Sequence, residues 1–364
     1  GQGAMMRMYE QALPKAYQGG KYGHRLPIGT IEVIDNFPYQ ALRDYYETWY
    51  RPDQQGIIVV GDIDVDKVEA KIKEIFSPIK MPANAPERKY EPVADNKEPI
   101  ITIAKDKEQP STMIYIWHKH PATPNEAKGN IGYLVQNYLF SMISSMMHAR
   151  LEELRQEANP PFIQAASGDS DFLLSKTAEA FVGMAVSKDD GIQTAISALV
   201  REIERARKFG FTASEYARAK ADYLRSLESA YNERDKMKNN QYVQEYVRHF
   251  IDNEPIPGIE MEYTLMNQLA PSIPVEAINS ILPQLIKDEN IVINIFGPDK
   301  EGMVYPTEAE ILDILKNTKA EEITAYVDKV SDEPLMKETP KAGKIVKTEA
   351  GPFGSTALTL SNGV

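Results

Sequence analysis

The residues of this chain with the clearest chemical potential are two histidines, His118 and His120, separated by one residue. Alternate residues of a strand point to the same face, so both rings could join a metal site if a third ligand arrives from elsewhere. The flanking Lys119, Pro121 and Pro124 instead favour an exposed strand end. We therefore expect this pair to be structural.

The other histidines do not form a local zinc motif. Neither His-Glu-x-x-His nor its inversion His-x-x-Glu-His occurs in the chain. His148 and Glu152 are four residues apart on a predicted helix, which is the ordinary spacing of a surface pair. His249 lies near a predicted helix end, where a polar cap is expected. The sequence thus predicts no catalytic residue, no cofactor-binding residue and no metal ligand in this chain.

Composition and missing motifs exclude further kinds of chemistry. The chain has no cysteine, so disulfides and thiol nucleophiles are excluded. It has no Gly-x-Ser-x-Gly and no phosphate-binding glycine motif, and residues 166–171 are predicted to be a turn. The 41 basic and 53 acidic residues give a net charge of −12, which opposes binding to nucleic acid or anionic lipid. No apolar run approaches the roughly 20 residues of a membrane span, and no stretch of the given sequence has the pattern of a signal peptide. We expect neither a nucleic acid nor a membrane partner.

The first part of the chain reads as helix, strand and helix. Residues 5–13 have a helical composition, and an irregular loop follows at 19–29. A helix over 37–49, capped by Asn36, is expected to lead into a strand over 57–60 that is buried on both faces. Asp64 is expected to cap a helix whose apolar stripe extends from Val65 to Phe76. Residues 81–99 are rich in proline and predict a linker.

The region from 100 to 300 predicts a second unit of mixed composition. Its expected strands are 100–104, 112–118, 162–166, 178–186 and 290–296, and its expected helices are 125–157, 189–208, 213–251, 259–269 and 274–286. Thr212 and Glu215 match a capping box at one helix start. The predicted fold class is α+β, with antiparallel sheets and helices packed on one face.

The last part of the chain predicts a second linker and the start of a hairpin. Residues 301–356 are polar apart from one helix near 307–317. Residues 357–361 read as a strand that runs into Asn362-Gly363, a strong hairpin signal. We expect this strand to open a further unit whose returning strand lies beyond the chain, so that the chain is part of a longer protein. Residues 46–64 and 285–299 repeat one element order, a helix end, a strand and a polar turn, which favours a duplicated lobe.

In their order, these features resemble the insulinase or pitrilysin-type zinc peptidases, and above all their bacterial putative zinc protease members. The resemblance rests on Leu26-Pro27-Ile28-Gly29-Thr30, on Trp49-Tyr50-Arg51-Pro52 and on the apolar run at 57–60 followed by Gly61-Asp62. Arg150-Leu151 and Glu153-Leu154-Arg155 extend it into the second unit. The resemblance implies paired α+β lobes that enclose a chamber for peptides. It assigns 1–80 to the end of a catalytic-type lobe, 100–300 to a noncatalytic lobe and 357–364 to the first strand of a third lobe.

The family's zinc ligands are absent from this chain. By resemblance they are the two histidines of His-x-x-Glu-His and a downstream glutamate, all placed before the region that this chain matches. Glu10 lies near that downstream position but is expected to have no metal role. The chain alone is therefore expected to be inactive, as a noncatalytic fragment of a zinc endopeptidase that supplies chamber wall and substrate-contact surface. Zinc is expected in the parent protein only.

Two other functions remain open at this stage. One is a catalytically empty family member that acts as a scaffold or peptide-binding partner of an active subunit. The other is an unrelated α+β binding protein. The expected partners are the remaining lobes of the parent and a peptide substrate, and a second copy of the chain is a further candidate. The resemblance favours a periplasmic or cell-envelope location for the parent.

Overall fold

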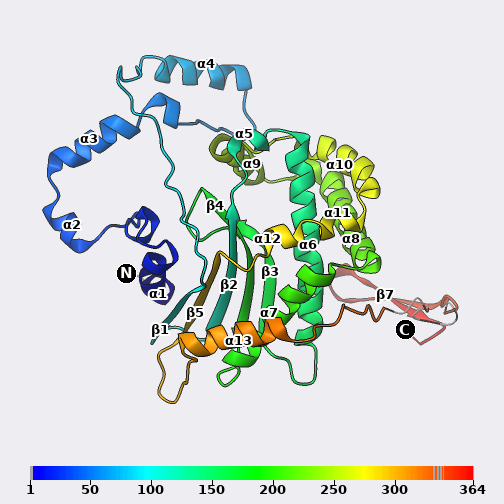
Figure 1. Cartoon of the computed structure of the whole chain (residues 1–364). Helices are drawn as coiled ribbons and strands as arrows, with labels where there is room; N and C mark the ends of the chain where they lie inside the picture. The colour runs from blue at the N-terminus through cyan, green and yellow to red at the C-terminus, as the bar shows by residue number, and fades with distance from the viewer. Residues whose placement is uncertain (1–2, 331–332, 334–335, 337, 339, 364) are drawn as a thin grey trace. The chain divides into compact units, whose positions relative to one another are not determined.

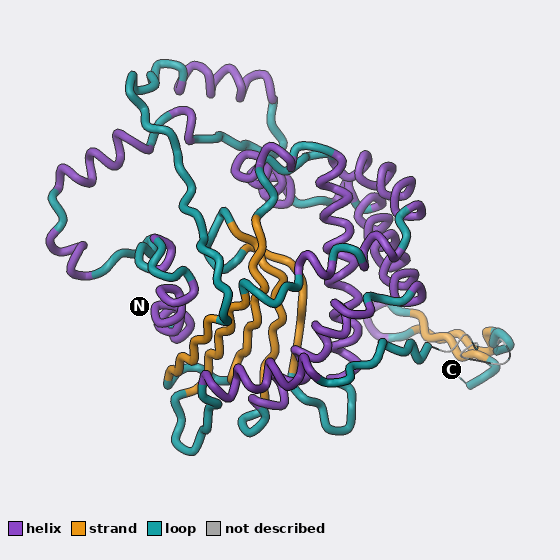
Figure 2. Tube along the Cα trace, in the orientation of Figure 1, coloured by secondary structure: helices purple, strands orange, loops and turns teal. Residues whose placement is uncertain are grey.

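Five strands form one mixed sheet, in the order β1, β5, β2, β4 and β3. The computed structural model describes residues 3–330, 333, 336, 338 and 340–363. The strands are β1 (Ile100–Asp106), β2 (Thr112–Pro121), β3 (Gln164–Asp171), β4 (Ala178–Ser187) and β5 (Ile291–Pro298). β1 and β5 run parallel, and the other neighbours are antiparallel. Figure 2 shows the five strands side by side. The α+β class is confirmed, but the sheet is mixed rather than antiparallel because β1 follows the direction of β5.

The main hydrophobic core lies between one face of this sheet and a layer of helices. The helices of this part of the chain are α5 (Asn125–Lys128), α6 (Ile131–Arg155), α7 (Ile192–Phe209), α8 (Ala213–Asn232), α9 (Asn239–Asp252), α10 (Gly258–Leu269), α11 (Val275–Asn279), α12 (Leu282–Leu285) and α13 (Glu308–Ala320). Met142 and Met146 of α6 and Leu199 and Ile203 of α7 pack in one cluster with Ile116 of β2. Figure 1 shows α6 and α7 beside the strands.

The opposite face of the sheet carries α1 (Ala4–Ala16). Leu13 and Tyr17 pack there against Trp117 and Phe172, in a second cluster of buried residues. The Arg7 guanidinium also binds Asp106 of β1, with Nε 2.7 Å from Oδ2. Helices therefore cover both faces of the sheet, and the expectation that they pack on one face only is wrong. All eight residues of β5 are buried, and their side chains point alternately to the two faces of the sheet. Both faces must therefore be covered by other elements.

Residues 31–76 differ most from the sequence-based expectation. They form three helices, α2 (Ile31–Asn36), α3 (Tyr39–Trp49) and α4 (Val65–Phe76), none of which has a buried residue. Asn36 ends α2 instead of capping α3, whose N-cap is Pro38. Asp64 caps α4 as predicted, since its side chain accepts a hydrogen bond from the Lys67 amide. The apolar stripe of α4 is nevertheless exposed rather than packed.

The buried strand expected over 57–60 does not form. These residues have no strand partner among the described residues, and Ile57 and Val59 are 46% and 48% exposed. The residue just before this run, Gly56, lies beside α9 instead. A Cβ atom added to Gly56 would lie only 3.0 Å from the ring of Phe250, a residue of α9. A strand is stable only when its backbone N–H and C=O groups form hydrogen bonds with a neighbouring strand, and the helix α9 cannot replace such a strand. Of the two repeats predicted from element order, only the second contains a strand, β5.

Three further expectations about elements are corrected by pairing and packing. Residues 166–171 are not a turn but belong to β3, which pairs with β4. The helix expected over 213–251 is divided into α8 and α9 by a 3-10 turn at Arg234–Lys236. The helix expected near 307–317 forms as α13, but it packs Ile311 and Leu315 into the main core, so this part of 301–356 is not a linker. The capping box of Thr212 and Glu215 is confirmed at the start of α8.

The chain divides into two compact units, residues 1–326 and 327–364. The second unit contains a hairpin of β6 (Ile345–Ala350) and β7 (Thr356–Leu360), joined by a 3-10 turn at Pro352–Gly354. The strand expected to begin near Ala357 therefore already has a partner, and that partner precedes it in the chain. The expected strand after Asn362-Gly363 stays a prediction, because β7 has a second edge at which it could pair. No described helix is both long enough and apolar enough to cross a membrane.

Candidate functional site

Three potential ligand side chains meet where the strands β2, β3 and β4 end together. His120 is the penultimate residue of β2 and lies directly opposite Glu179, the second residue of β4. Asp169 belongs to the next strand, β3, and lies opposite Phe181. Residues two apart on a strand share a face, so Glu179, Phe181 and their partners all point to the side of the sheet that carries α6 and α7. The register of three strands thus brings these side chains together.

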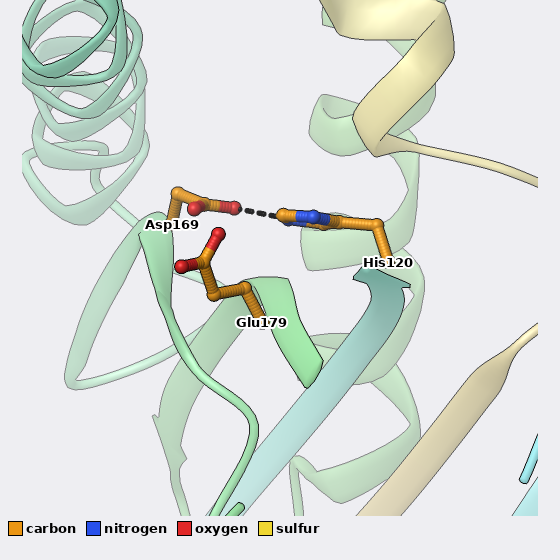
Figure 3. A group of neighbouring side chains, drawn as sticks. All are labelled: His120, Asp169 and Glu179. Carbon is orange, nitrogen blue, oxygen red and sulfur yellow. Dashed lines mark hydrogen bonds and ion pairs between the residues drawn. The ribbon is translucent and has the colours of Figure 1, made fainter. Parts of the chain in front are cut away.

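The three side chains are close enough for direct interaction. His120 Nε2 lies 2.7 Å from Asp169 Oδ1, and His120 Nδ1 lies 3.2 Å from the Pro121 carbonyl oxygen. One possible ligand atom from each of His120, Asp169 and Glu179 lies within 4.8 Å of those of the other two. Figure 3 shows the His120 ring and the Asp169 carboxylate end to end, with the Glu179 carboxylate turned toward the gap between them. The side chains of His120 and Asp169 are only 10% and 7% exposed.

The cluster perturbs the protonation of its own members. Burial opposes the positive charge of His120, but the hydrogen bond and negative charge of Asp169 outweigh it and raise the pKa of the ring. Burial also raises the pKa of the Glu179 carboxyl, and the charge of Asp169 raises it further. The strand ends therefore hold two carboxylates and one imidazole in a partly desolvated place.

Glu179 also lines a cleft of about 550 Å³. The cleft is bordered by α5, α9 and the connection from β3 to β4, and charged residues of both signs line it. Some of them pair across it: Lys176 Nζ lies 3.4 Å from Asp252 Oδ1. Arg248 Nε similarly lies 3.0 Å from Glu254 Oε2. The cleft gives the cluster access to solvent on one side.

His118 does not join this cluster, although it shares a strand with His120. Its ring is buried, and its Nδ1 lies 3.0 Å from the Lys287 carbonyl oxygen, to which it donates. Burial lowers the pKa of His118 to about 4, so the ring is neutral at neutral pH. The expectation that the pair lies at an exposed strand end is wrong, because β4 pairs with β2 as far as Pro121 and β5 pairs with it as far as His118. Of the two histidines, His120 alone therefore lies close to other potential metal ligands.

The other residues singled out in the sequence lie elsewhere. Glu152 binds Arg155, with Arg155 Nε 2.7 Å from Glu152 Oε2, so it is engaged in a surface ion pair of α6. His148 is exposed on the same helix. His249 lies in the last turn of α9, as expected, and its Nδ1 is 2.6 Å from the Glu254 carbonyl oxygen. Glu10 is exposed on α1.

Sequence reasoning missed Asp169 and Glu179. Asp169 stood in a run read as a turn, and Glu179 stood in a predicted strand without a partner. The alternation of Asp169 with Asp171 was the available signal, since it is the pattern of a strand face. The pairing of β2 with β4 and of β4 with β3 decides that these residues meet His120, and register cannot be read from one sequence.

Known proteins are similar to this chain in sequence. The family model described as "Peptidase M16 inactive domain" matches residues 36–223, just over half of the chain. "Zinc protease PQQL-like" of Arabidopsis thaliana is 26% identical over 365 residues, covering 98% of this chain and 34% of that protein. "Probable zinc protease PqqL" of Escherichia coli (strain K12) is 26% identical over 344 residues, covering 93% of this chain and 36% of that protein. The chain thus spans about a third of the length of these curated relatives.

Solved structures share the fold. The periplasmic protease PqqL from Escherichia coli matches with a TM-score of 0.78 and 24% identity, over 99% of this chain and 39% of that chain. The ferredoxin protease FusC, as its E83A mutant in complex with Arabidopsis ferredoxin, matches with a TM-score of 0.71 and 20% identity. That match covers 100% of this chain and 40% of the FusC chain.

The residues of this chain do not fit the zinc centre of a His-x-x-Glu-His peptidase. The motif is missing from the sequence. Within the described ranges, the one group of three potential ligands is His120, Asp169 and Glu179, which has a single histidine. No step of peptide hydrolysis is therefore assigned to a residue of this chain.

Proposed function

Because this chain belongs to the peptidase M16 family, we propose that it is a noncatalytic part of a larger zinc-dependent endopeptidase. The parent protein hydrolyses peptides by zinc-activated water, with its zinc ligands outside this chain. This chain supplies part of the chamber wall and of the surface that contacts the peptide. The observation that carries the proposal is the match to the family's inactive domain in a chain without His-x-x-Glu-His.

The exposed helices near the start of the chain support a role within a larger polypeptide. α2, α3 and α4 carry exposed apolar side chains at positions that would face a core, among them Ile31, Leu42, Tyr46 and Phe76. Monomeric proteins rarely expose so many large apolar residues in one segment unless another surface covers them. We assign residues 1–80 to the end of a catalytic-type lobe, whose remaining strands would pair with residues 57–60.

The remaining assignments follow the same family relation. We place the second, noncatalytic lobe at 100–300 and add α13 to it, because α13 packs into its core. A linker at 81–99 precedes this lobe, and the start of a third lobe lies in the hairpin of β6 and β7. The proposed substrate class is a peptide or a protein. One structural relative is named a ferredoxin protease, which supports a protein substrate for the parent. Another is named a periplasmic protease, which supports a periplasmic location.

A peptidase assay tests the proposal. The 364-residue chain and its parent polypeptide are incubated with zinc and a quenched fluorescent peptide library, and cleavage is followed by fluorescence. We expect cleavage by the parent, its loss when the parent's His-x-x-Glu-His glutamate is replaced by glutamine, and none by the chain alone. Zinc-dependent cleavage by the chain alone would overturn the proposal. An inactive parent without the motif would support the alternative of a catalytically empty scaffold.

A further inference from the structure

We propose that His120, Asp169 and Glu179 form a binding site for a divalent transition-metal ion of the zinc class. The site does not depend on the proposed function of the parent protein, since all three ligands belong to this chain. It departs from the expectation, drawn from the sequence, that the chain contains no metal ligand.

The geometry of the strands favours such a site. The three ligands come from three neighbouring strands, and each strand is hydrogen-bonded to the next. The possible ligand atoms already lie within 4.8 Å of one another, so small side-chain rotations would bring them around one ion. Zinc binds imidazole nitrogen and carboxylate oxygen at about 2.0–2.2 Å. Ligands held by a sheet lose little freedom when an ion binds, which favours affinity.

The charge of the cluster also favours a cation. Within the described residues, neither Asp169 nor Glu179 forms an ion pair with a lysine or an arginine, and Asp169 is nearly buried. Two carboxylates in one partly desolvated place are unfavourable unless a positive charge accompanies them. A neutral His120 leaves this charge uncompensated, whereas a bound divalent ion balances it.

The surroundings of the ligands match those of metal sites. In the structure His120 Nε2 donates a hydrogen bond to Asp169 Oδ1 at 2.7 Å. A bound ion would replace that hydrogen, and the ring would keep its hydrogen on Nδ1, which lies 3.2 Å from the Pro121 carbonyl oxygen. The Glu179 carboxylate lines the cleft. That cleft provides an entry path and water for the open coordination positions. One imidazole with two carboxylates suits zinc or manganese better than soft ions that prefer sulfur.

Zinc titration of the intact chain tests the proposal. The chain is stripped with a chelator, dialysed, and titrated with ZnCl2 by calorimetry, with Co²⁺ absorption as an independent readout of coordination. We expect one ion per chain and a rise in Tm on zinc addition. His120→Gln, Asp169→Asn and Glu179→Gln are each expected to weaken binding by about tenfold or more and to reduce the rise in Tm. Circular dichroism of each variant checks that it is folded.

His148→Gln serves as the matched control, because His148 is an exposed histidine of the same chain outside the cluster. Its zinc affinity is expected to equal that of the unchanged chain. The proposal is overturned if the chain binds no zinc, or if folded variants of all three ligands bind it as tightly as the unchanged chain. Equal loss of binding in His148→Gln would also overturn it, since the ion would then be held at the surface. If the zinc-loaded chain cleaves peptides, that result contradicts the proposed function but not the metal site.

Discussion

Arg150 of α6 and Glu215 of α8 form a two-pronged ion pair in the interior of the main unit. Arg150 Nε lies 2.6 Å from Glu215 Oε1, and Arg150 Nη2 lies 3.0 Å from Glu215 Oε2. Both side chains are less than 5% exposed. The same guanidinium donates to the Gly210 carbonyl oxygen and to Glu202 of α7. One arginine therefore ties together three helices that cover the sheet.

Replacing this arginine should destabilise the chain strongly. Arg150→Met leaves Glu215 without its cation in a buried place, and breaking a buried pair typically costs about 3–5 kcal/mol. We expect a loss of this size in the free energy of unfolding, measured by urea denaturation. The control is Arg225→Met, because Arg225 forms an exposed pair with Asp222 and should change stability by less than about 0.5 kcal/mol. Equal losses in the two variants would contradict a special role for Arg150.

The contact between α1 and β1 should make stability depend on acid pH. The Arg7 side chain, followed by the Glu108 amide, lowers the pKa of Asp106 to about 2 from its usual 3.8. The unfolded chain then binds more protons than the folded chain between about pH 4 and pH 2. Stability from this carboxylate is complete above pH 4 and is lost as the pH falls through 2.

Asp106→Asn tests this pH dependence. The variant should be less stable than the unchanged chain at neutral pH, and its free energy of unfolding should decline less between pH 4 and pH 2. The exposed Asp313 of α13 provides the control variant Asp313→Asn. Thermal unfolding at a series of pH values measures all three proteins. Parallel pH profiles for Asp106→Asn and the unchanged chain would show that the Arg7 contact does not hold the carboxylate charged.

Gly210 is expected to tolerate no side chain. It follows α7 with a φ of 68°, and an added Cβ would lie 2.4 Å from Asn279 Cγ. Asn279 cannot easily move, because its side chain bonds both the amide and the carbonyl of Phe211. Gly210→Ala should therefore cost about 2–4 kcal/mol, from backbone strain and overpacking together.

Gly302 allows the cost of backbone strain to be measured apart from the cost of overpacking. Its φ of 82° is similar, but an added Cβ there would meet nothing within 4 Å. Gly302→Ala should thus cost only about 1 kcal/mol, the share that comes from backbone strain. Urea unfolding of both variants gives the difference. A Gly302→Ala loss as large as that of Gly210→Ala would remove the argument from the Asn279 contact.

The exposed helices should differ measurably from the core in hydrogen exchange. α3 and α4 contain no buried residue, whereas every residue of β5 is buried. Amides of α3 and α4 should therefore exchange much faster than those of β5 in the isolated chain. In the parent polypeptide, α3 and α4 should become protected if other lobes cover them. Mass spectrometry after proteolysis measures both, and unchanged exchange in the parent would count against such cover.

The sequence alone predicted most helices and the strands of the main sheet, because local signals specify them. The helix expected over 125–157, most of which forms as α6, and the Thr212 and Glu215 capping box of α8 are examples that the structure confirms. The family resemblance, carried by short motifs such as Trp49-Tyr50-Arg51-Pro52, is likewise confirmed by the family match. The absence of His-x-x-Glu-His was evident from the sequence as well.

Tertiary structure decided the features that depend on partners distant in the sequence. The residues at 57–60 have the composition of a buried strand, yet they form none because no described strand lies beside them. His120 meets Asp169 and Glu179 only because β4 pairs with both β2 and β3 in one particular register. A shift of one residue would turn these side chains to the other face. Local propensity thus determined the elements, whereas long-range pairing determined which side chains share a site.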